Sequence, residues 1–73
     1  MIADEIFWYG DKVHWIPYDG ADRSLWENGI VKSFSDDGKI IFVVYHCGGE
    51  WDKFWNYTGC GTSSSELGRG WIS

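Results

Sequence analysis

Two apolar, β-rich runs flank a short turn sequence near the middle of the chain, and this arrangement constrains the fold most strongly. The stretch from Trp26 to Tyr45 reads WENGIVKSFSDDGKIIFVVY, with Asp37-Gly38 between the two runs. Asp-Gly between such runs is a strong signal for a β-hairpin, because glycine adopts positive φ without steric cost. The sequence therefore predicts an antiparallel pair at the centre of a small sheet that is closed or nearly closed.

The pairing register of this hairpin depends on the length of its loop. A two-residue loop at Asp37-Gly38 places Ile30, Lys32 and Phe34 on one face with Ile41, Val43 and Tyr45, and Val31, Ser33 and Ser35 on the other with Ile40, Phe42 and Val44. A three-residue loop shifts the register by one residue and exchanges one of the sets. Both registers stay open at this stage, and a β-bulge near Gly29 is expected.

Shorter segments on either side of the hairpin complete the prediction. Residues 12–18 alternate as a strand, and residues 51–57 form a fourth strand or a bulged segment. A single helical or 3₁₀ turn is expected through Ser65, Glu66 and Leu67, before a short last strand at Trp71-Ile72.

This order of elements is typical of an all-β, five-stranded, SH3-like barrel with a short 3₁₀ turn before its last strand. At 73 residues the chain has the length of one small domain. We expect residues 10–73 to form the barrel and residues 1–9 to form an N-terminal arm or an extra edge strand.

The aromatic content indicates a binding surface. The chain has six Trp, four Tyr and four Phe, and each aromatic side chain buries about 150–250 Å². Together they exceed what one small core can hold, so some are expected at the surface or along a groove.

The acidic charge excludes one class of partner and leaves others open. Six basic residues stand against eleven acidic ones, and the net charge is −5. Direct nucleic-acid binding is therefore not expected, because it depends on Lys and Arg that neutralise phosphates. The acidic surplus fits solubility, a basic partner or mimicry of a nucleic acid. No signal peptide is predicted, and the longest apolar run, residues 40–45, is too short to span a bilayer, so we expect a cytoplasmic protein with no membrane partner.

The residues that could carry chemistry lack the spacing that chemistry needs. His14, His46, Cys47 and Cys60 form no zinc-binding pair of the usual spacing. The glycines near Cys60 lack the lysine of a phosphate-binding loop. The sequence therefore predicts no metal, no cofactor and no enzymatic activity, with both cysteines as free thiols.

Four short segments resemble Tudor-type domains, which belong to the SH3-like barrel class. They are Gly10–Val13, Asn28–Val31, Phe42–Tyr45 and Ser64–Leu67, and the resemblance covers residues 10–67. Tudor domains bind methylated Lys or Arg in an aromatic cage. The resemblance implies cage positions at Trp26 and Tyr45, with Tyr18 and Trp51 as looser matches. The segment His46-Cys47-Gly48 departs from the family pattern, and the alternative is that Trp26 and Tyr45 only pack at the barrel rim.

A second set of segments is similar to short phage and prophage proteins of unassigned function. It comprises Gly29–Ser33, Phe42–Tyr45, Asn56–Gly59, Leu67 and Gly70-Trp71. This resemblance implies a phage-related origin and no established activity. Small phage proteins often bind and disable a host protein, including defence nucleases, so an anti-defence inhibitor is expected by analogy.

Acidic residues accompany the candidate aromatics. Glu27 follows Trp26, and Glu50 and Asp52 flank Trp51. Acids beside exposed rings suit a cationic partner, whereas the alternative is a solvated rim. The sequence thus predicts a protein-binding module whose site comprises Tyr18, Trp26, Glu27, Tyr45, Glu50, Trp51 and Asp52, with a host protein as partner. Two other functions stay open. One is mimicry of a nucleic acid by acidic residues, including Asp36 and Asp37. The other is self-assembly, for example as a homodimer, through the N-terminal segment Ile6-Phe7-Trp8.

Overall fold

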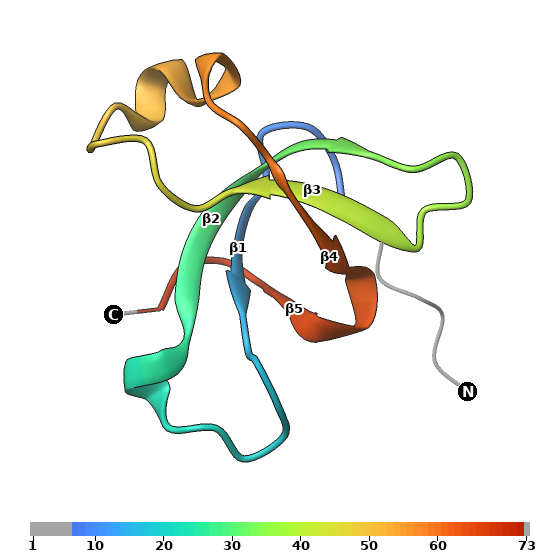
Figure 1. Ribbon diagram of the computed structural model, residues 1–73, viewed down its shortest axis with the longest axis vertical. Helices are drawn as coiled ribbons and strands as arrows, with labels where there is room; N and C mark the ends of the chain where they lie inside the picture. Colours follow the sequence, from blue (N-terminus) through green and yellow to red (C-terminus); the bar gives the residue numbers. More distant parts are fainter. Residues whose placement is uncertain (1–6, 73) are drawn as a thin grey trace.

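Five antiparallel strands form one sheet in the computed structural model, which describes residues 7–72. The strands are β1 (Lys12–Trp15), β2 (Glu27–Phe34), β3 (Ile40–Val44), β4 (Cys60–Ser63) and β5 (Leu67–Arg69). Their order is β4-β3-β2-β1-β5, and Figure 1 shows β2 curving between its partners β1 and β3. The predicted all-β, five-stranded class is confirmed. Within the described residues β4 and β5 do not pair, so the sheet is not closed.

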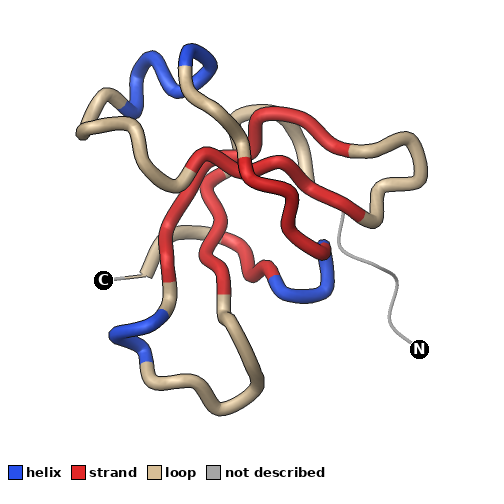
Figure 2. Tube along the Cα trace, in the orientation of Figure 1, coloured by secondary structure: helices blue, strands red, loops and turns tan. Residues whose placement is uncertain are grey.

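Three short 3₁₀ segments connect the strands (Figure 2). They are η1 (Arg23–Leu25), η2 (Trp51–Asn56) and η3 (Ser64–Glu66), and η3 lies directly before the last strand as predicted. The predicted strand at residues 51–57 is wrong, because η2 occupies it and the fourth strand forms at Cys60–Ser63 instead. The last strand is Leu67–Arg69 rather than Trp71-Ile72.

The chain forms η2 because its apolar residues recur every third position. Gly48 and Gly49 have φ values of 60° and 85° and reverse the chain after β3. η2 consists of two short turns joined by a kink at Lys53, whose φ of −132° and ψ of 31° are not helical. Trp51 lies before the kink, Phe54 lies after it, and Tyr57 is the extended residue that follows η2. All three pack into one apolar cluster, which a strand with its two-residue period would not allow.

The β2–β3 hairpin is present, and its register near the tip is the one expected for a two-residue loop. Phe34 pairs with Ile41, and Ser33 pairs with Phe42. The turn itself is longer than two residues, since residues 35–39 lie between the strands.

A β-bulge in β2 changes the register further from the tip. Between Val31 and Ser33 the pairing shifts, so that Val31 pairs with Val43 and Ile30 with Val44. The extra residue of a bulge moves the following side chains to the opposite face. Of the two registers that the sequence leaves open, the two-residue-loop register would place Ile30 on the face of Val43. Beyond the bulge Val31 takes that place, and Ile30 pairs with Val44.

The sheet separates two apolar clusters. The strand cluster consists of Phe7, Val13, Val31, Ile41, Val43 and Leu67, with Trp15 and Tyr45 packed against it. The loop cluster consists of Ile30, Val44, Cys47 and Phe54, with Trp51 and Tyr57 packed against it. Consecutive residues of one strand, such as Val43 and Val44, contribute to different clusters because their side chains point to opposite faces.

The start of the described chain is tied to the sheet. Phe7 is buried in the strand cluster, whereas Trp8 and Tyr9 are exposed. The Trp8 amide donates to a carboxylate oxygen of Asp11 at 2.8 Å. Residues 1–6 of the predicted arm, including Ile6 of the predicted assembly segment, lie outside the described residues. Among the described residues, no helix is long and apolar enough to cross a membrane.

Candidate functional site

A hollow of about 280 Å³ opens at one end of the sheet. It is lined by Trp15, Glu27, Tyr45, His46, Cys60, Gly61 and Thr62, and we call it the Trp15–Tyr45 hollow. These residues come from the end of β1, the start of β2, the end of β3 and the start of β4. Four strand ends therefore form its walls.

Antiparallel pairing brings these strand ends together. Trp15 pairs with Glu27 across β1 and β2, and Cys60 pairs with Val43 across β4 and β3. Trp15 and Tyr45 pack against the strand cluster, with ring centroids 6.4 Å apart and planes inclined at 56°. The base of the hollow is thus apolar, and two aromatic rings form its sides.

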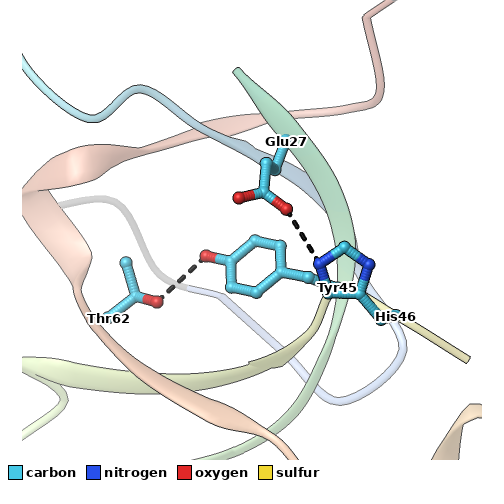
Figure 3. A network of polar contacts seen from close by, with 4 residues as sticks. All are labelled: Glu27, Tyr45, His46 and Thr62. Carbon is cyan, nitrogen blue, oxygen red and sulfur yellow. Dashed lines mark hydrogen bonds and ion pairs between the residues drawn. The ribbon is translucent and has the colours of Figure 1, made fainter. Parts of the chain in front are cut away.

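Polar contacts hold these side chains in place (Figure 3). The hydroxyls of Tyr45 and Thr62 are hydrogen-bonded at 2.9 Å, and Glu27 lies 3.2 Å from the imidazole of His46. The Trp15 indole donates to Glu66 at 3.2 Å. Tyr45 and Trp15 are therefore each fixed by a hydrogen bond as well as by packing, which keeps the rings in one orientation.

The electrostatics of the hollow favour positive charge. Burial raises the pKa of the Tyr45 hydroxyl, the hydrogen bond from Thr62 lowers it, and the negative charge of Glu27 raises it further. The Tyr45 hydroxyl therefore keeps its proton and is neutral at ordinary pH. No Lys or Arg is among the residues that line the hollow.

Three other aromatic rings are in contact with Lys or Arg side chains of the same chain. Lys12 lies 4.7 Å from the Trp71 ring centroid, Arg23 lies 5.3 Å from that of Trp26, and Arg69 lies 5.1 Å from that of Phe7. A cation is attracted by the negative face of an aromatic ring. The rings of the Trp15–Tyr45 hollow thus differ from these three in having no Lys or Arg beside them, although His46 contacts the Glu27 carboxylate there.

A hollow of about 320 Å³ at the hairpin tip is less suited to a cation. Its lining includes Trp8 and Phe34, together with Asp36, Asp37 and Lys39. The Asp37 carboxylate accepts hydrogen bonds from the Lys39 amide and from its neighbour Ser35, and these bonds lower its pKa. Asp37 is thus already hydrogen-bonded within the turn, and Lys39 lies on the rim of this hollow.

The structure brings two of the predicted site residues together, Glu27 and Tyr45. Tyr18 lies outside this hollow and lines another one with the neighbouring Pro17. Trp26 stacks on His14 with centroids 5.5 Å apart and planes at 9°, and its indole donates to the Ala21 carbonyl at 3.0 Å. Trp26 is thus packed against the sheet and forms no wall of the Trp15–Tyr45 hollow.

The three remaining predicted site residues lie in η2 or directly before it, since Glu50 precedes the segment and Trp51 and Asp52 begin it. Trp51 packs edge-on against Trp71 with centroids 4.9 Å apart and contributes to the loop cluster. Glu50 accepts a hydrogen bond from the Tyr57 hydroxyl. Asp52 is exposed. They lie away from Glu27 and Tyr45, so the predicted residues do not form a single four-walled cage.

Sequence reasoning missed Trp15, Thr62 and Cys60 as residues of the site. Trp15 carries a readable signal, since the alternation of residues 12–18 places it on the face of Val13. Thr62 and Cys60 carry none, because their strand was expected elsewhere. Their place in the hollow depends on the pairing of β4 with β3.

Among residues 7–72, no group of three or more His, Cys, Asp or Glu side chains is arranged to hold a metal ion. Both cysteines are free thiols, Cys47 buried and Cys60 exposed. Comparison of the chain with protein families, curated proteins and solved structures found no match.

Proposed function

We propose that the chain is a non-enzymatic protein-binding module that takes a cationic side chain of its partner into the Trp15–Tyr45 hollow. The observation that carries this proposal is the composition of the hollow, in which two fixed rings and the Glu27 carboxylate face a space with no Lys or Arg on its walls. A cation over an aromatic ring gains about 0.5–2 kcal/mol. A neighbouring carboxylate adds a charge-assisted hydrogen bond.

We further propose that the fold belongs to the SH3-like barrel class with Tudor-like features. The position of β1 between β5 and β2, the meander of β2, β3 and β4, and the 3₁₀ turn before the last strand support this assignment. The Trp15–Tyr45 hollow lies between the β1–β2 and β3–β4 connections. Trp15 and Tyr45 then replace the expected pair of Trp26 and Tyr45 as the aromatic walls.

The proposed partner is a host protein, and the proposed origin of the chain is a phage. The origin rests on the resemblance of segments such as Gly29–Ser33 and Phe42–Tyr45 to small phage proteins. The net charge of −5 supports a basic partner surface, because opposite charges speed association and select partners. Inhibition of a defence protein is one activity that such binding would produce.

The first test is a titration of the ¹⁵N-labelled chain with N-acetyl-arginine amide and N-acetyl-trimethyllysine amide, followed by NMR. We expect the indole signal of Trp15 to shift with at least one probe, and the shift to be lost in Glu27→Gln. Glu50→Gln is the matched control, because Glu50 hydrogen-bonds Tyr57 outside the hollow. An unmoved Trp15 signal, or an equal shift in Glu27→Gln, would overturn the cationic site.

Affinity capture from nuclease-treated bacterial cytosol then tests the partner. A single protein that is retained by wild type and Glu50→Gln but lost with Glu27→Gln supports the proposal. The double reversal Asp36→Lys/Asp37→Lys serves as the comparison for acidic mimicry, since both acids lie at the exposed hairpin tip. Loss with this variant alone, with steep salt dependence, would favour mimicry.

Self-association is a second candidate function, favoured by exposed aromatic side chains. Trp8, Tyr9 and Trp55 are 62%, 59% and 50% exposed, and Tyr9 and Trp55 both contact Phe54. Light scattering on Trp8→Ser/Trp55→Ser tests it, and a mass that equals one chain in wild type would exclude it. Point substitutions are needed because deletion of residues 1–8 would also remove the buried Phe7.

A further inference from the structure

A second hollow of about 350 Å³ lies beside the Trp15–Tyr45 hollow. It is lined by Ile16, Pro17, Tyr18 and Asp19 from the β1–β2 connection and by Ser65, Glu66, Leu67 and Gly68 from η3 and β5. We call it the Tyr18 hollow. Tyr18 is 60% exposed, so its ring is available to a ligand.

Residues that line the two hollows contact each other. Trp15, which lines the first, donates its indole N–H to a carboxylate oxygen of Glu66, which lines the second, at 3.2 Å. The next residue, Ile16, donates its amide to the Glu66 carbonyl at 3.1 Å. The backbone and side chain of Glu66 thus fix the end of β1 against η3, and the two hollows lie on either side of this contact.

Both hollows have carboxylates on their walls, and the first also has a histidine, His46. Glu27 lines the first, Asp19 and Glu66 line the second, and neither lining includes Lys or Arg. Each hollow therefore combines an aromatic ring with at least one carboxylate. The hairpin-tip hollow differs, because Lys39 lies on its rim.

We propose that the two hollows bind one extended segment of a partner protein that carries two basic side chains, with Trp15 between them. This inference rests on the proposed function, since the first basic side chain occupies the Trp15–Tyr45 hollow. The second occupies the Tyr18 hollow, where the Tyr18 ring and the Asp19 carboxylate receive it. Arginine suits both hollows, because its planar guanidinium stacks on a ring while it donates to a carboxylate.

The length of chain between the hollows sets the spacing of the two basic residues. Tyr18 follows Trp15 by three residues, so their Cα atoms are at most about 11 Å apart. An extended segment rises about 3.3 Å per residue, so basic side chains two or three residues apart are separated by about 7–10 Å, which lies within this limit. Once the first is bound, the second binds intramolecularly at a high effective concentration, which raises the affinity above that of either side chain alone.

Four synthetic peptides test the proposal by NMR titration of the wild-type chain. Two contain a pair of arginines spaced two or three residues apart, a third replaces the second arginine with glutamine, and a fourth places two arginines at its two ends. The last peptide keeps the total charge and removes the spacing. We expect either closely spaced pair to bind about ten-fold more tightly than the single-arginine and end-placed peptides.

Two double variants locate the second basic side chain. Tyr18→Ala/Asp19→Asn changes only the Tyr18 hollow, and we expect it to reduce the affinity for the closely spaced pairs to that of the single-arginine peptide. Trp55→Ala/Asp52→Asn is the matched control, since it removes an exposed ring and an exposed carboxylate on η2, and the affinity should not change.

The possible outcomes separate this inference from the proposed function. Equal affinity for single and paired arginines, with binding still lost in Glu27→Gln, would overturn the two-site groove and keep the cationic hollow. Tighter binding of a pair that Tyr18→Ala/Asp19→Asn leaves unchanged would also overturn it, because the second arginine then lies elsewhere. Absence of binding by all four peptides would overturn both.

Discussion

The strand cluster and the loop cluster lie on opposite faces of one sheet, yet their side chains come from different kinds of structure. Five of the six residues of the strand cluster belong to strands, as Val13 and Val43 illustrate. The loop cluster takes Ile30 and Val44 from strands but is completed by Cys47 and Phe54 from the connection after β3. One face is thus covered by the sheet's own curvature and the other by a folded loop.

This difference between the two faces explains where the aromatic residues that the core does not hold are located. Trp51 and Tyr57 pack against the loop cluster, and Trp71 packs edge-on against Trp51. The Trp71 indole also donates to the Gly29 carbonyl at 2.8 Å. These rings cover the outside of a small sheet, while Trp15 and Tyr45, at the end of the strand cluster, form walls of an open hollow. The aromatic residues that cover the loop cluster are therefore not the ones that line the Trp15–Tyr45 hollow.

The largest expected effect comes from removing the ring that fills the loop cluster. Phe54 is 7% exposed, and Phe54→Ala should lower the free energy of unfolding by about 3–5 kcal/mol. Trp55→Ala is the matched control, because the neighbouring Trp55 is half exposed and should cost much less. Thermal and urea unfolding measure both. A small effect of Phe54→Ala would mean that the loop cluster adds little to the stability of the sheet.

The strand cluster is the part of the fold that the sequence predicts best. Alternation is a local property, so residues such as Val31 and Val43 can be assigned to a buried strand without knowledge of the rest of the chain. A bulge is expected near Gly29, but the sequence does not fix its position between Val31 and Ser33, which decides which face each residue takes. The sequence therefore leaves the face of Ile30 open between two registers, and the pairing of Ile30 with Val44 decides it.

The loop cluster was harder to predict because its signal has another period. Trp51, Phe54 and Tyr57 recur every third residue, which is the period of a 3₁₀ helix, but a segment of this length is too short for periodicity alone to separate helix from strand. The fourth strand at Cys60–Ser63 contains two small residues and a cysteine, and it is defined by pairing with β3. The same pairing decides the site, since it sets Thr62 beside Tyr45.

The next largest expected effect tests how closely β2 and β3 approach each other at Gly29. A Cβ atom at Gly29 would lie 2.5 Å from Val43 Cγ1 and 2.8 Å from the Val44 carbonyl oxygen. Because the backbone of β3 cannot move without breaking its ladder, Gly29→Ala should cost about 3 kcal/mol. Gly61→Ala is the control, since its nearest contact would be an ordinary 3.4 Å. Equal melting temperatures of the two variants would contradict this.

Substitution of the two cysteines should change the free energy of unfolding by a smaller amount. One of them, Cys47, belongs to the loop cluster. Cys47 is 2% exposed, whereas Cys60 is exposed at the hollow. Cys47→Ser buries a hydroxyl among apolar side chains and should lower the free energy of unfolding by about 1–2 kcal/mol. Cys60→Ser should change it by less than about 0.5 kcal/mol. A fully stable Cys47→Ser variant would show that its hydroxyl finds a partner or that water enters the cluster.

The smallest expected effect is a change in the pKa of a tyrosine at each cluster, Tyr45 at the strand cluster and Tyr57 at the loop cluster. Both Tyr45 and Tyr57 have a pKa raised above the ordinary value of 10.0, but the first-ranked causes differ. Burial dominates for Tyr45, whereas the hydrogen bond to Glu50 dominates for Tyr57. Glu50→Gln should therefore return the pKa of Tyr57 toward 10.0, while Glu27→Gln should lower that of Tyr45 only slightly. An NMR titration of labelled tyrosine measures both values.

The same shifts make the stability of the protein depend on alkaline pH. A raised pKa means that the folded state keeps its proton where the unfolded state loses it, so the free energy of unfolding is unaffected below pH 10 and falls as the pH rises above it. In Glu50→Gln this fall should be shallower, because the pKa of Tyr57 then lies closer to its value in the unfolded chain. A cation bound in the Trp15–Tyr45 hollow should act on Tyr45 alone and lower its pKa, because positive charge favours the phenolate. An arginine probe that moves the titration of Tyr57 but leaves that of Tyr45 unchanged would place the cation at the loop cluster and contradict the proposed site.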